Sequence, residues 1–244
     1  MANALVVIPT YNEQANIARM IHAVLSLPEQ FDLLIIDDNS PDGTAREVES
    51  LKQNYPARLI LHKRSGKLGL GTAYIHGFKW ALENNYAFII EMDADFSHDP
   101  NDLPRMLEAC KGDADVVVGS RYVHNGKVVN WPANRIILSK GASLYVRLIT
   151  WIPVKDTTAG FVCYKRKVLE AIELDAIRFI GYAFQIELKF AAWKCGFKIV
   201  EIPIVFKDRE AGISKMSKGI FREAVLGVLK MKWKSLFTSY RTTT

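Results

Sequence analysis

The sequence has few cysteines and no pattern that marks a disulfide framework or a zinc site. Its three cysteines, Cys110, Cys163 and Cys195, are far apart and form no CxxC pair, so we interpret them as buried free thiols in a reducing compartment. The five histidines have no HxxH or HExxH spacing, which argues against zinc. No GxSxG motif or Cys/His pairing indicates covalent catalysis.

Long apolar runs are also absent. No stretch approaches the roughly 18 to 20 residues that a membrane-spanning helix needs, and Met1 leads into a strand-like run without a secretory leader. We therefore expect a cytoplasmic protein. The 49% hydrophobic content supplies a core, and the net charge of +6 favours an anionic partner such as a nucleotide, a phospholipid or nucleic acid. Because the basic residues are not interleaved with aromatics on a strand surface, nucleic acid is not expected.

The glycine-rich segment 66–71 matches neither of the common nucleotide motifs. It is not a GxGxxG that opens a helix after a strand, and it is not a P-loop. We expect these glycines to allow a tight loop and close backbone approach.

Short apolar runs alternate with helical patterns through the first half of the chain. The predicted strands are 4–8, 33–36, 58–62, 86–90 and 116–118, and helices are predicted at 15–27, 44–52 and from about 72 to 83. The second half is less regular, with helices predicted at 136–152 and 182–193 and strands at 161–164, 198–202 and 204–207. This order predicts an α/β fold with a mostly parallel sheet flanked by helices.

Three of these strands end in acidic loops, which contain Glu13, the pair Asp37/Asp38 and the pair Asp93/Asp95. Ligands of open α/β sheets bind beyond the carboxyl ends of the strands, so we expect the three loops to form one cleft. Carboxylates spaced i, i+2 suit a hard divalent ion such as Mg²⁺ or Mn²⁺. The alternative is that the Asp93/Asp95 segment is an ordinary solvated turn.

Basic residues follow the later strands. Arg121 lies just past a strand and should point to the acidic edge, and Arg135 and Ser139 share one helix face at i, i+4 spacing. Arginine matches phosphate oxygens bidentately. Arg209 and Lys215 lie in a glycine-containing loop that could close over a diphosphate.

The C-terminal part differs in composition. We predict a catalytic domain at 1–215 and a basic amphipathic helix and tail at 216–244. Such a helix, with Trp and Phe on its apolar face, is typical of a membrane-surface element, but an ordinary packing helix has the same pattern. The sequence leaves both open.

Together these segments resemble a known family. The motifs are Pro9-Thr10-Tyr11-Asn12-Glu13, Ile36 through Thr44, Met92 through His98, Gly119 through Tyr122 and Asp208 through Met216, in this order. They are similar to those of the polyprenol (dolichol) monophosphate mannose synthases, inverting family 2 glycosyltransferases of GT-A fold. The resemblance covers residues from about 4 to 230.

The resemblance implies a role for each matching residue. Donor base and ribose would be held by Pro9, Tyr11, Glu13, Ile36 and Asp38. The metal ion would be bound by Asp93 and Asp95, with Ala94 lining the pocket, and the diphosphate would be covered by Arg209 and Lys215. The acceptor phosphate would be received by Arg121, Arg135 and Ser139. Ser97 stands where some family members carry a metal-contacting Gln, which leaves that position to water.

The implied reaction is metal-dependent transfer of a sugar, mannose from GDP-mannose, to a polyprenyl or dolichyl phosphate, giving a β-linked product. Asp95 and Arg121 would be catalytic. The enzyme would be peripheral on the cytoplasmic face of a membrane, brought there by its basic tail or by a separate membrane-anchoring protein. Alternatives left open are a UDP donor carrying glucose or another sugar, and a non-catalytic membrane-surface or binding module. A nucleotidyltransferase would carry a glycine-rich loop after the first strand, where this chain has Pro9 through Glu13.

Overall fold

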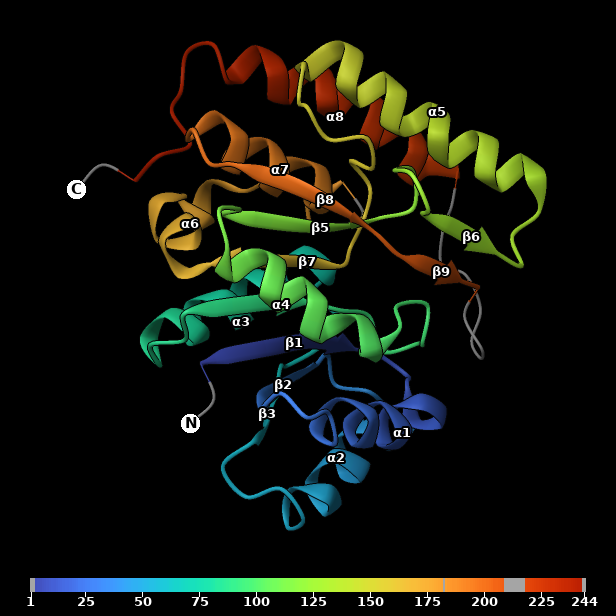
Figure 1. The fold of residues 1–244 in the computed structure, drawn as a ribbon, viewed down its shortest axis with the longest axis vertical. Coiled ribbons are helices and arrows are strands. Elements are labelled where there is room, and N and C mark those ends of the chain that lie inside the picture. Colours follow the sequence, from blue (N-terminus) through green and yellow to red (C-terminus); the bar gives the residue numbers. More distant parts are fainter. Residues whose placement is uncertain (1–2, 182, 209–217, 243–244) are drawn as a thin grey trace.

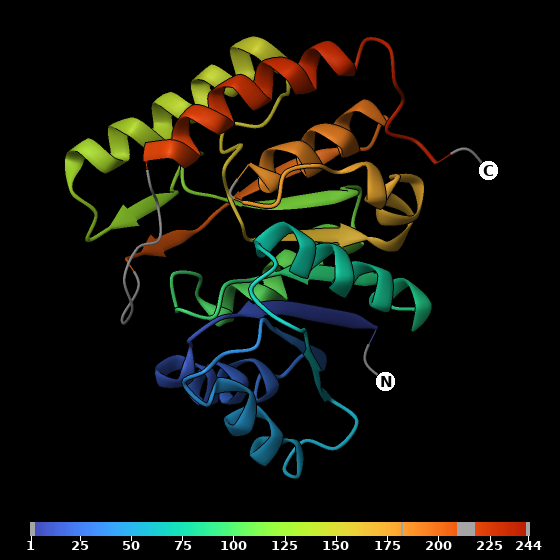
Figure 2. The same cartoon turned by 180° about the vertical axis from the view of Figure 1, so that it is seen from behind.

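The structure is a computed structural model that describes residues 3–181, 183–208 and 218–242 (Figure 1). In these ranges the chain forms a seven-stranded sheet with helices on both faces (Figures 1 and 2). The strands are β1 (Ala4–Thr10), β2 (Phe31–Asp37), β3 (Leu59–Lys63), β4 (Phe88–Glu91), β5 (Val116–Ser120), β7 (Val162–Lys165) and β8 (Ile199–Pro203), and a second sheet pairs β6 (Lys127–Val129) with β9 (Val205–Lys207). The helices are α1 (Gln14–Leu25), α2 (Thr44–Lys52), α3 (Leu70–Glu83), α4 (Leu103–Lys111), α5 (Ala133–Thr150), α6 (Arg166–Ala171), α7 (Phe184–Lys194) and α8 (Lys218–Lys234), with 3-10 turns η1 (Pro100–Asp102) and η2 (Leu174–Ala176).

The sheet order is β3-β2-β1-β4-β7-β5-β8. The strand pairs are parallel except where β7 runs antiparallel to its neighbours β4 and β5. The predicted α/β fold with a mostly parallel sheet is thus confirmed, but the antiparallel strand was not foreseen. Its direction matters for the site. The amino end of β7 lies at the edge where the parallel strands have their carboxyl ends, so the loop 156–161 reaches that edge.

Apolar side chains alternate along the strands and supply a core on each face. Leu5 and Val7 pack on the side of α3 and α7, whereas Val6 and Ile8 pack on the side of α1, α2 and α4. All four are fully buried. Burial on both faces explains why β1 is a continuous apolar run and not an alternating one.

The glycine-rich loop behaves as its composition predicts. Gly69 has a φ of 105°, which favours glycine. A Cβ on Gly71 would come within 2.6 Å of the Phe179 carbonyl oxygen, so a side chain there would force the backbone to move. The loop is therefore a tight lead into α3.

Some elements and details differ from the prediction. The sequence analysis did not indicate α4, α6 or β6, which have 9, 6 and 3 residues. Cys110 and Cys163 are buried as expected, but Cys195 is only partly buried.

The C-terminal helix α8 lies alongside α5, at the top of both views in Figures 1 and 2. Val228 and Met231 are buried and belong to the core, while Leu229 and Trp233 are exposed. The helix therefore packs against the core on one face, as the packing interpretation predicts, and leaves apolar side chains exposed on another. Its role at a membrane surface stays a prediction. None of the described helices is both long enough and apolar enough to span a bilayer.

Candidate functional site

The predicted site residues fall into two groups at one edge of the sheet. Asp93, Asp95, Arg121, Arg135 and Ser139 line a single cavity of about 220 Å³. This cavity lies beyond the ends of β4 and β5, where the loop before β7 also arrives. The structure thus brings carboxylates and guanidinium groups, which are far apart in the sequence, around one space.

The turn after β4 sets the two carboxylates at different depths. The Asp95 Oδ1 accepts a hydrogen bond from the Ser97 N–H at 3.1 Å, and Asp95 is buried. The Asp93 side chain is 40% exposed and faces the cavity. Phe96, directly after Asp95, has a φ of 58°. This backbone conformation is unfavourable for an aromatic residue, and such strain often occurs at functional sites.

His98 is hydrogen-bonded to this turn, a role that the sequence analysis did not identify. Its Nδ1 accepts a hydrogen bond from the Asp93 N–H at 3.3 Å, and its ring packs against Phe161 and Phe206. Burial lowers the pKa of His98 to about 4, against the opposing influence of Asp95. The imidazole is therefore neutral, as an acceptor at Nδ1 must be.

The oxygen groups at the turn fit a hard divalent cation. Asp93 and Asp95 offer carboxylate oxygens, and the buried Ser97 Oγ has no hydrogen-bond partner among the described residues. No group of three His, Cys, Asp or Glu side chains suited to a metal occurs in the ranges that the structure describes. A cation here would therefore need oxygens from water or a ligand to complete its coordination, as Mg²⁺ commonly does.

Arg121 is held rigidly beside this turn. Its Nε and Nη2 donate to the two oxygens of Asp156 at 2.7 and 2.6 Å, and its backbone N–H donates to the same carboxylate at 2.9 Å. Burial would lower the pKa of Arg121, but the hydrogen bonds that it donates to Asp156, and the negative charge of that carboxylate, outweigh burial and raise the pKa. Thr158 accepts a further bond from Nη2 at 2.8 Å. The guanidinium thus lines the cavity as a fixed cation.

Asp156 was noted in the sequence only as part of a loop. It is completely buried, and its backbone N–H donates to the carboxylate of Glu201 at 2.9 Å. The loop reaches Arg121 because β7 is antiparallel, which no local pattern in the sequence indicated.

The cavity's outer wall carries a second cation. The Arg135 guanidinium lies 3.8 Å from the centre of the Trp131 ring, and its Nη1 donates to Asp208 at 3.1 Å. Arg135 and Ser139 lie one turn apart on α5 and both line the cavity, as their spacing predicted. Arg135 is more exposed than Arg121, so it is the more adaptable of the two cations.

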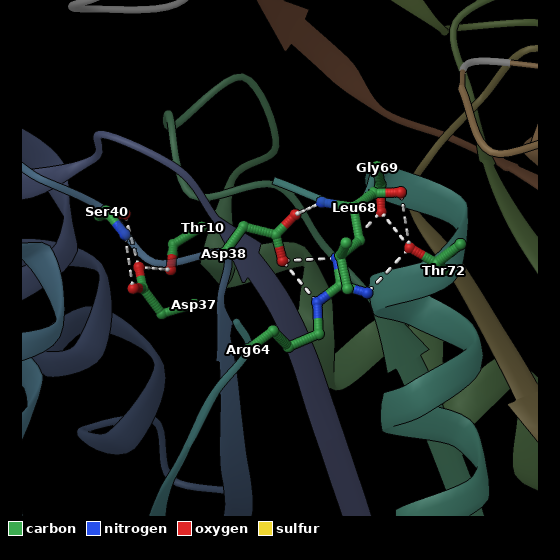
Figure 3. Close-up of polar contacts among 8 residues, drawn as sticks. All are labelled: Thr10, Asp37, Asp38, Ser40, Arg64, Leu68, Gly69 and Thr72. Atoms are coloured by element: carbon green, nitrogen blue, oxygen red, sulfur yellow. Dashed lines mark hydrogen bonds and ion pairs between the residues drawn. The ribbon is translucent and has the colours of Figure 1, made fainter. Parts of the chain in front are cut away.

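Asp38 has a structural task at the end of β2 (Figure 3). Its carboxylate accepts hydrogen bonds from Arg64 Nε at 2.5 Å and from the Leu68 N–H at 3.1 Å. Arg64 in turn donates to Thr72 Oγ1 and to the Gly69 carbonyl oxygen. Asp38 and Arg64 therefore fix the glycine-rich loop at the start of α3, and Arg64 was not singled out from the sequence.

The neighbouring Asp37 holds the loop after β2 instead of facing the cavity (Figure 3). It accepts hydrogen bonds from Thr10 Oγ1 at 2.9 Å and from the Ser40 N–H and hydroxyl at 2.9 and 2.6 Å.

Of the remaining predicted donor residues, three lie after or at the end of β1, outside the cavity. Pro9, Tyr11 and Glu13 are partly buried. The Tyr11 ring lies 4.5 Å from Lys67 Nζ, and the Glu13 N–H donates to Thr44 Oγ1 at 3.0 Å. They form a half-exposed surface beside the ends of β1 and β2.

The structure places two predicted residues differently. The Ile36 side chain is completely buried in the core, so it could meet a nucleotide only through its backbone. Ala94, expected to line the pocket, is buried in the opposite core and is not among the described residues that line the cavity. Arg209 and Lys215 lie outside the described residues.

A buried acid and base lie behind the cavity, and neither was expected. Lys189 is fully buried on α7 and its Nζ donates to the Ala159 carbonyl oxygen at 2.6 Å. Burial lowers the pKa of Lys189 to about 8 and raises the pKa of Glu91 to about 8, while the two groups attract each other. Sequence reasoning treats such residues as solvated, because buried Lys and Glu are rare.

Comparison with known proteins gives consistent results. Residues 5–173 match the model of Glycosyl transferase family 2. Over 224 residues the chain is 46% identical to the polyprenol monophosphomannose synthase of Mycolicibacterium smegmatis, covering 92% of this chain and 84% of that protein. Over 236 residues it is 45% identical to the undecaprenyl-phosphate mannosyltransferase of Micrococcus luteus, and the match covers 95% of this chain and 96% of that protein.

Among solved structures, the fold is similar to that of glucosyl-3-phosphoglycerate synthase from Mycobacterium tuberculosis, crystallised with Mn²⁺, UDP and glucosyl-3-phosphoglycerate. The TM-score is 0.67 over 94% of this chain and 79% of that one. At 16% sequence identity this similarity concerns the fold alone.

Proposed function

Because this chain belongs to glycosyl transferase family 2, we propose that it transfers mannose from GDP-mannose to the phosphate of a polyprenyl lipid, with inversion at the anomeric carbon and with a divalent metal ion. The observation that carries this proposal is the cavity itself. Carboxylates at Asp93 and Asp95 and guanidinium groups at Arg121 and Arg135 surround one space. A reaction between a diphosphate donor and an anionic acceptor needs such a division of charge.

The donor would enter from the β1 and β2 side. Pro9, Tyr11 and Glu13 would contact its base and ribose, and Asp38 would act by fixing the glycine-rich loop beside them. The cofactor would be Mg²⁺ or Mn²⁺, held by Asp93 and Asp95, and would offset the negative charge of the departing diphosphate. Arg209 and Lys215 would cover the diphosphate.

The acceptor phosphate would lie between Arg121, Arg135 and Ser139. A lipid phosphate is already an anion near neutral pH, so the chain does not need to supply a strong general base. The two arginines instead offset the repulsion between two anions and align them for attack. Asp156 keeps Arg121 in place, so its charge is positioned before the substrate binds.

The lipid part of the acceptor would meet the outer surface of α5 and α8. This two-helix surface is apolar, with exposed side chains of Ile137, Leu144, Leu148, Trp151, Leu229, Trp233 and Phe237. Exposed basic residues border it at Lys140, Arg147 and Lys230. Apolar and basic side chains on one helical surface suit the interface of an anionic bilayer.

The position of this surface fits a lipid substrate. Arg135 and Ser139 lie at the amino-terminal end of α5, which leads from the cavity into the two-helix surface. A polyprenyl phosphate could therefore leave its chain in the bilayer while its phosphate enters the cavity. The protein could reach this position by binding the membrane directly or through a separate membrane-anchoring protein.

A uridine donor is the second candidate, because the structural neighbour with the same fold was crystallised with UDP. Such a donor would keep the cavity and its charges and change the sugar or the base.

The test is a matrix of donors and acceptors. Purified protein is incubated with GDP-mannose, UDP-glucose or UDP-N-acetylglucosamine, with and without a short polyprenyl phosphate and with Mg²⁺, Mn²⁺ or EDTA. We expect turnover of GDP-mannose that requires both lipid and metal. Turnover of a uridine donor would replace the proposed donor, and donor binding without transfer to lipid would contradict the proposed acceptor.

A further inference from the structure

The cavity wall includes a buried side-chain amide. Gln185, on α7, is 3% exposed and lines the cavity. Its Nε2 and Oε1 make no well-aligned hydrogen bond among the described residues, and on the core side the amide interacts with the buried carboxyl of Glu91. Buried polar groups are almost always fully paired, so an amide at a cavity wall with hydrogen-bonding capacity left over indicates a missing ligand atom.

The neighbours of this amide show which part of the cavity it serves. From the position that a Cβ on Gly160 would take, the Gln185 Nε2 lies at 3.7 Å, the His98 Cε1 at 3.8 Å and the Asp93 Oδ2 at 4.0 Å. The amide and the Asp93 carboxylate are therefore neighbours across Gly160. Since glycine has no side chain there, the space between them stays open.

Behind the amide lies the core. The fully buried carboxyl of Glu91 lies on this side and interacts with the Gln185 amide. Gln185 thus stands between a buried carboxyl group and the open cavity. Its two N–H groups and its oxygen give it more hydrogen-bonding capacity than the core side can use.

We infer that Gln185 binds hydroxyl groups of the donor sugar, an inference that rests on the proposed function. A hydroxyl is both donor and acceptor, and an amide matches it in both respects. An uncharged amide is a poor partner for a diphosphate, which the cations and the metal would hold. Asp93 marks the diphosphate end of the donor, and the sugar is the next group along it, where Gln185 lies.

The inference predicts a selective loss of affinity. In Gln185→Met the side chain keeps its length but loses both hydrogen-bonding groups. We expect the Kd for GDP-mannose to rise about tenfold, while the Kd for GDP stays within about twofold. The melting temperature should change little, because the variant removes a buried amide that makes no well-aligned hydrogen bond among the described residues.

Tyr164→Phe is the matched control. Tyr164 is fully buried on β7, and its hydroxyl, like the Gln185 amide, interacts with the carboxyl of Glu91. It does not line the cavity. This variant also removes a polar group beside Glu91 but does not reach the sugar, so both Kd values should match those of the wild type.

The measurement is calorimetric titration of both nucleotides with Mn²⁺ present, together with thermal melting. An equal rise of both Kd values, a lower melting temperature in Gln185→Met, or the same selective loss in Tyr164→Phe would show that the amide is structural and overturn the inference. If the wild type transfers mannose but Gln185→Met binds GDP-mannose normally, the inference alone is wrong. A wild type that binds neither nucleotide refutes the proposed function and the inference with it.

Discussion

The Asp156→Asn substitution probes the ion pair on which the acceptor side of the cavity depends. Asp156 is completely buried and accepts three hydrogen bonds from Arg121, at 2.6, 2.7 and 2.9 Å. Asparagine keeps the shape but replaces one acceptor oxygen by an N–H₂ group that faces the N–H groups of the arginine. The variant therefore leaves a cation that is only 8% exposed without its counter-charge.

The expected cost is large. Removing one partner of a buried ion pair typically destabilises a protein by about 3–5 kcal/mol. For a domain of this size each kcal/mol lowers the melting temperature by about 2–4 °C, so we expect a fall of roughly 6–20 °C. Mannosyl transfer should fall at least about tenfold, because the guanidinium loses its fixed orientation.

A double-mutant cycle tests the reasoning by urea denaturation. Arg121→Met removes the cation, so the double variant Arg121→Met/Asp156→Asn has no unpaired charge. It should be more stable than the sum of the single effects implies, by about 1–3 kcal/mol. Additive single effects, or a loss below about 1 kcal/mol in Asp156→Asn, would refute the claim that the pair holds the site.

Further predictions concern the metal site, the sugar space, acid sensitivity and the membrane surface. Asp95→Asn keeps the acceptor oxygen of the turn but removes its charge, so metal-dependent transfer should fall at least about 100-fold at an unchanged melting temperature, and near-normal transfer would contradict a metal role. In Gly160→Ala the added Cβ would lie 3.7 Å from its nearest neighbour, the Gln185 Nε2, so the variant should fold normally. Its methyl group would fill the sugar space and lower transfer about tenfold, whereas unaltered steady-state kinetics would place the sugar elsewhere. Burial lowers the pKa values of His62, His76 and His98, with His76 adding to the effect on His62 and Arg64 to that on His76, so the unfolded chain binds more protons below about pH 6.5 and the melting temperature should fall as the pH drops from about 7 to 5. His62→Gln should flatten that slope, and a slope equal to that of the wild type would contradict the assignment. Trp233 is 68% exposed, so Trp233→Ser should weaken sedimentation with anionic vesicles several-fold without changing the melting temperature, whereas unchanged sedimentation would contradict the membrane surface.

Local patterns in the sequence were sufficient for the fold class and part of the site. The apolar run that stops at Asp93 and Asp95 marks a strand end at the ligand edge of a parallel sheet. The i, i+4 spacing of Arg135 and Ser139 places both on one face of a helix. In each pattern the residues lie within a few positions of each other, so the pattern can be recognised without knowledge of the tertiary structure.

The missed features depend on contacts between distant segments. Asp156 reaches Arg121 only because β7 runs antiparallel, and strand direction has no local signature. Gln185 and Lys189 are polar residues on a helix that is buried almost all round, whereas composition places such residues at the surface. Ile36 and Ala94 show the converse, since adjacency to a motif does not determine which way a side chain faces.

The central claim is tested most directly by the product. Wild-type protein is incubated with isotope-labelled GDP-mannose, Mg²⁺ and polyprenyl phosphate in vesicles, and the lipid extract is analysed by mass spectrometry and for anomeric configuration. The account predicts a β-linked mannosyl phosphate lipid that is absent without lipid acceptor or with EDTA. Label that stays in the aqueous phase, or an α-linked product, would contradict it.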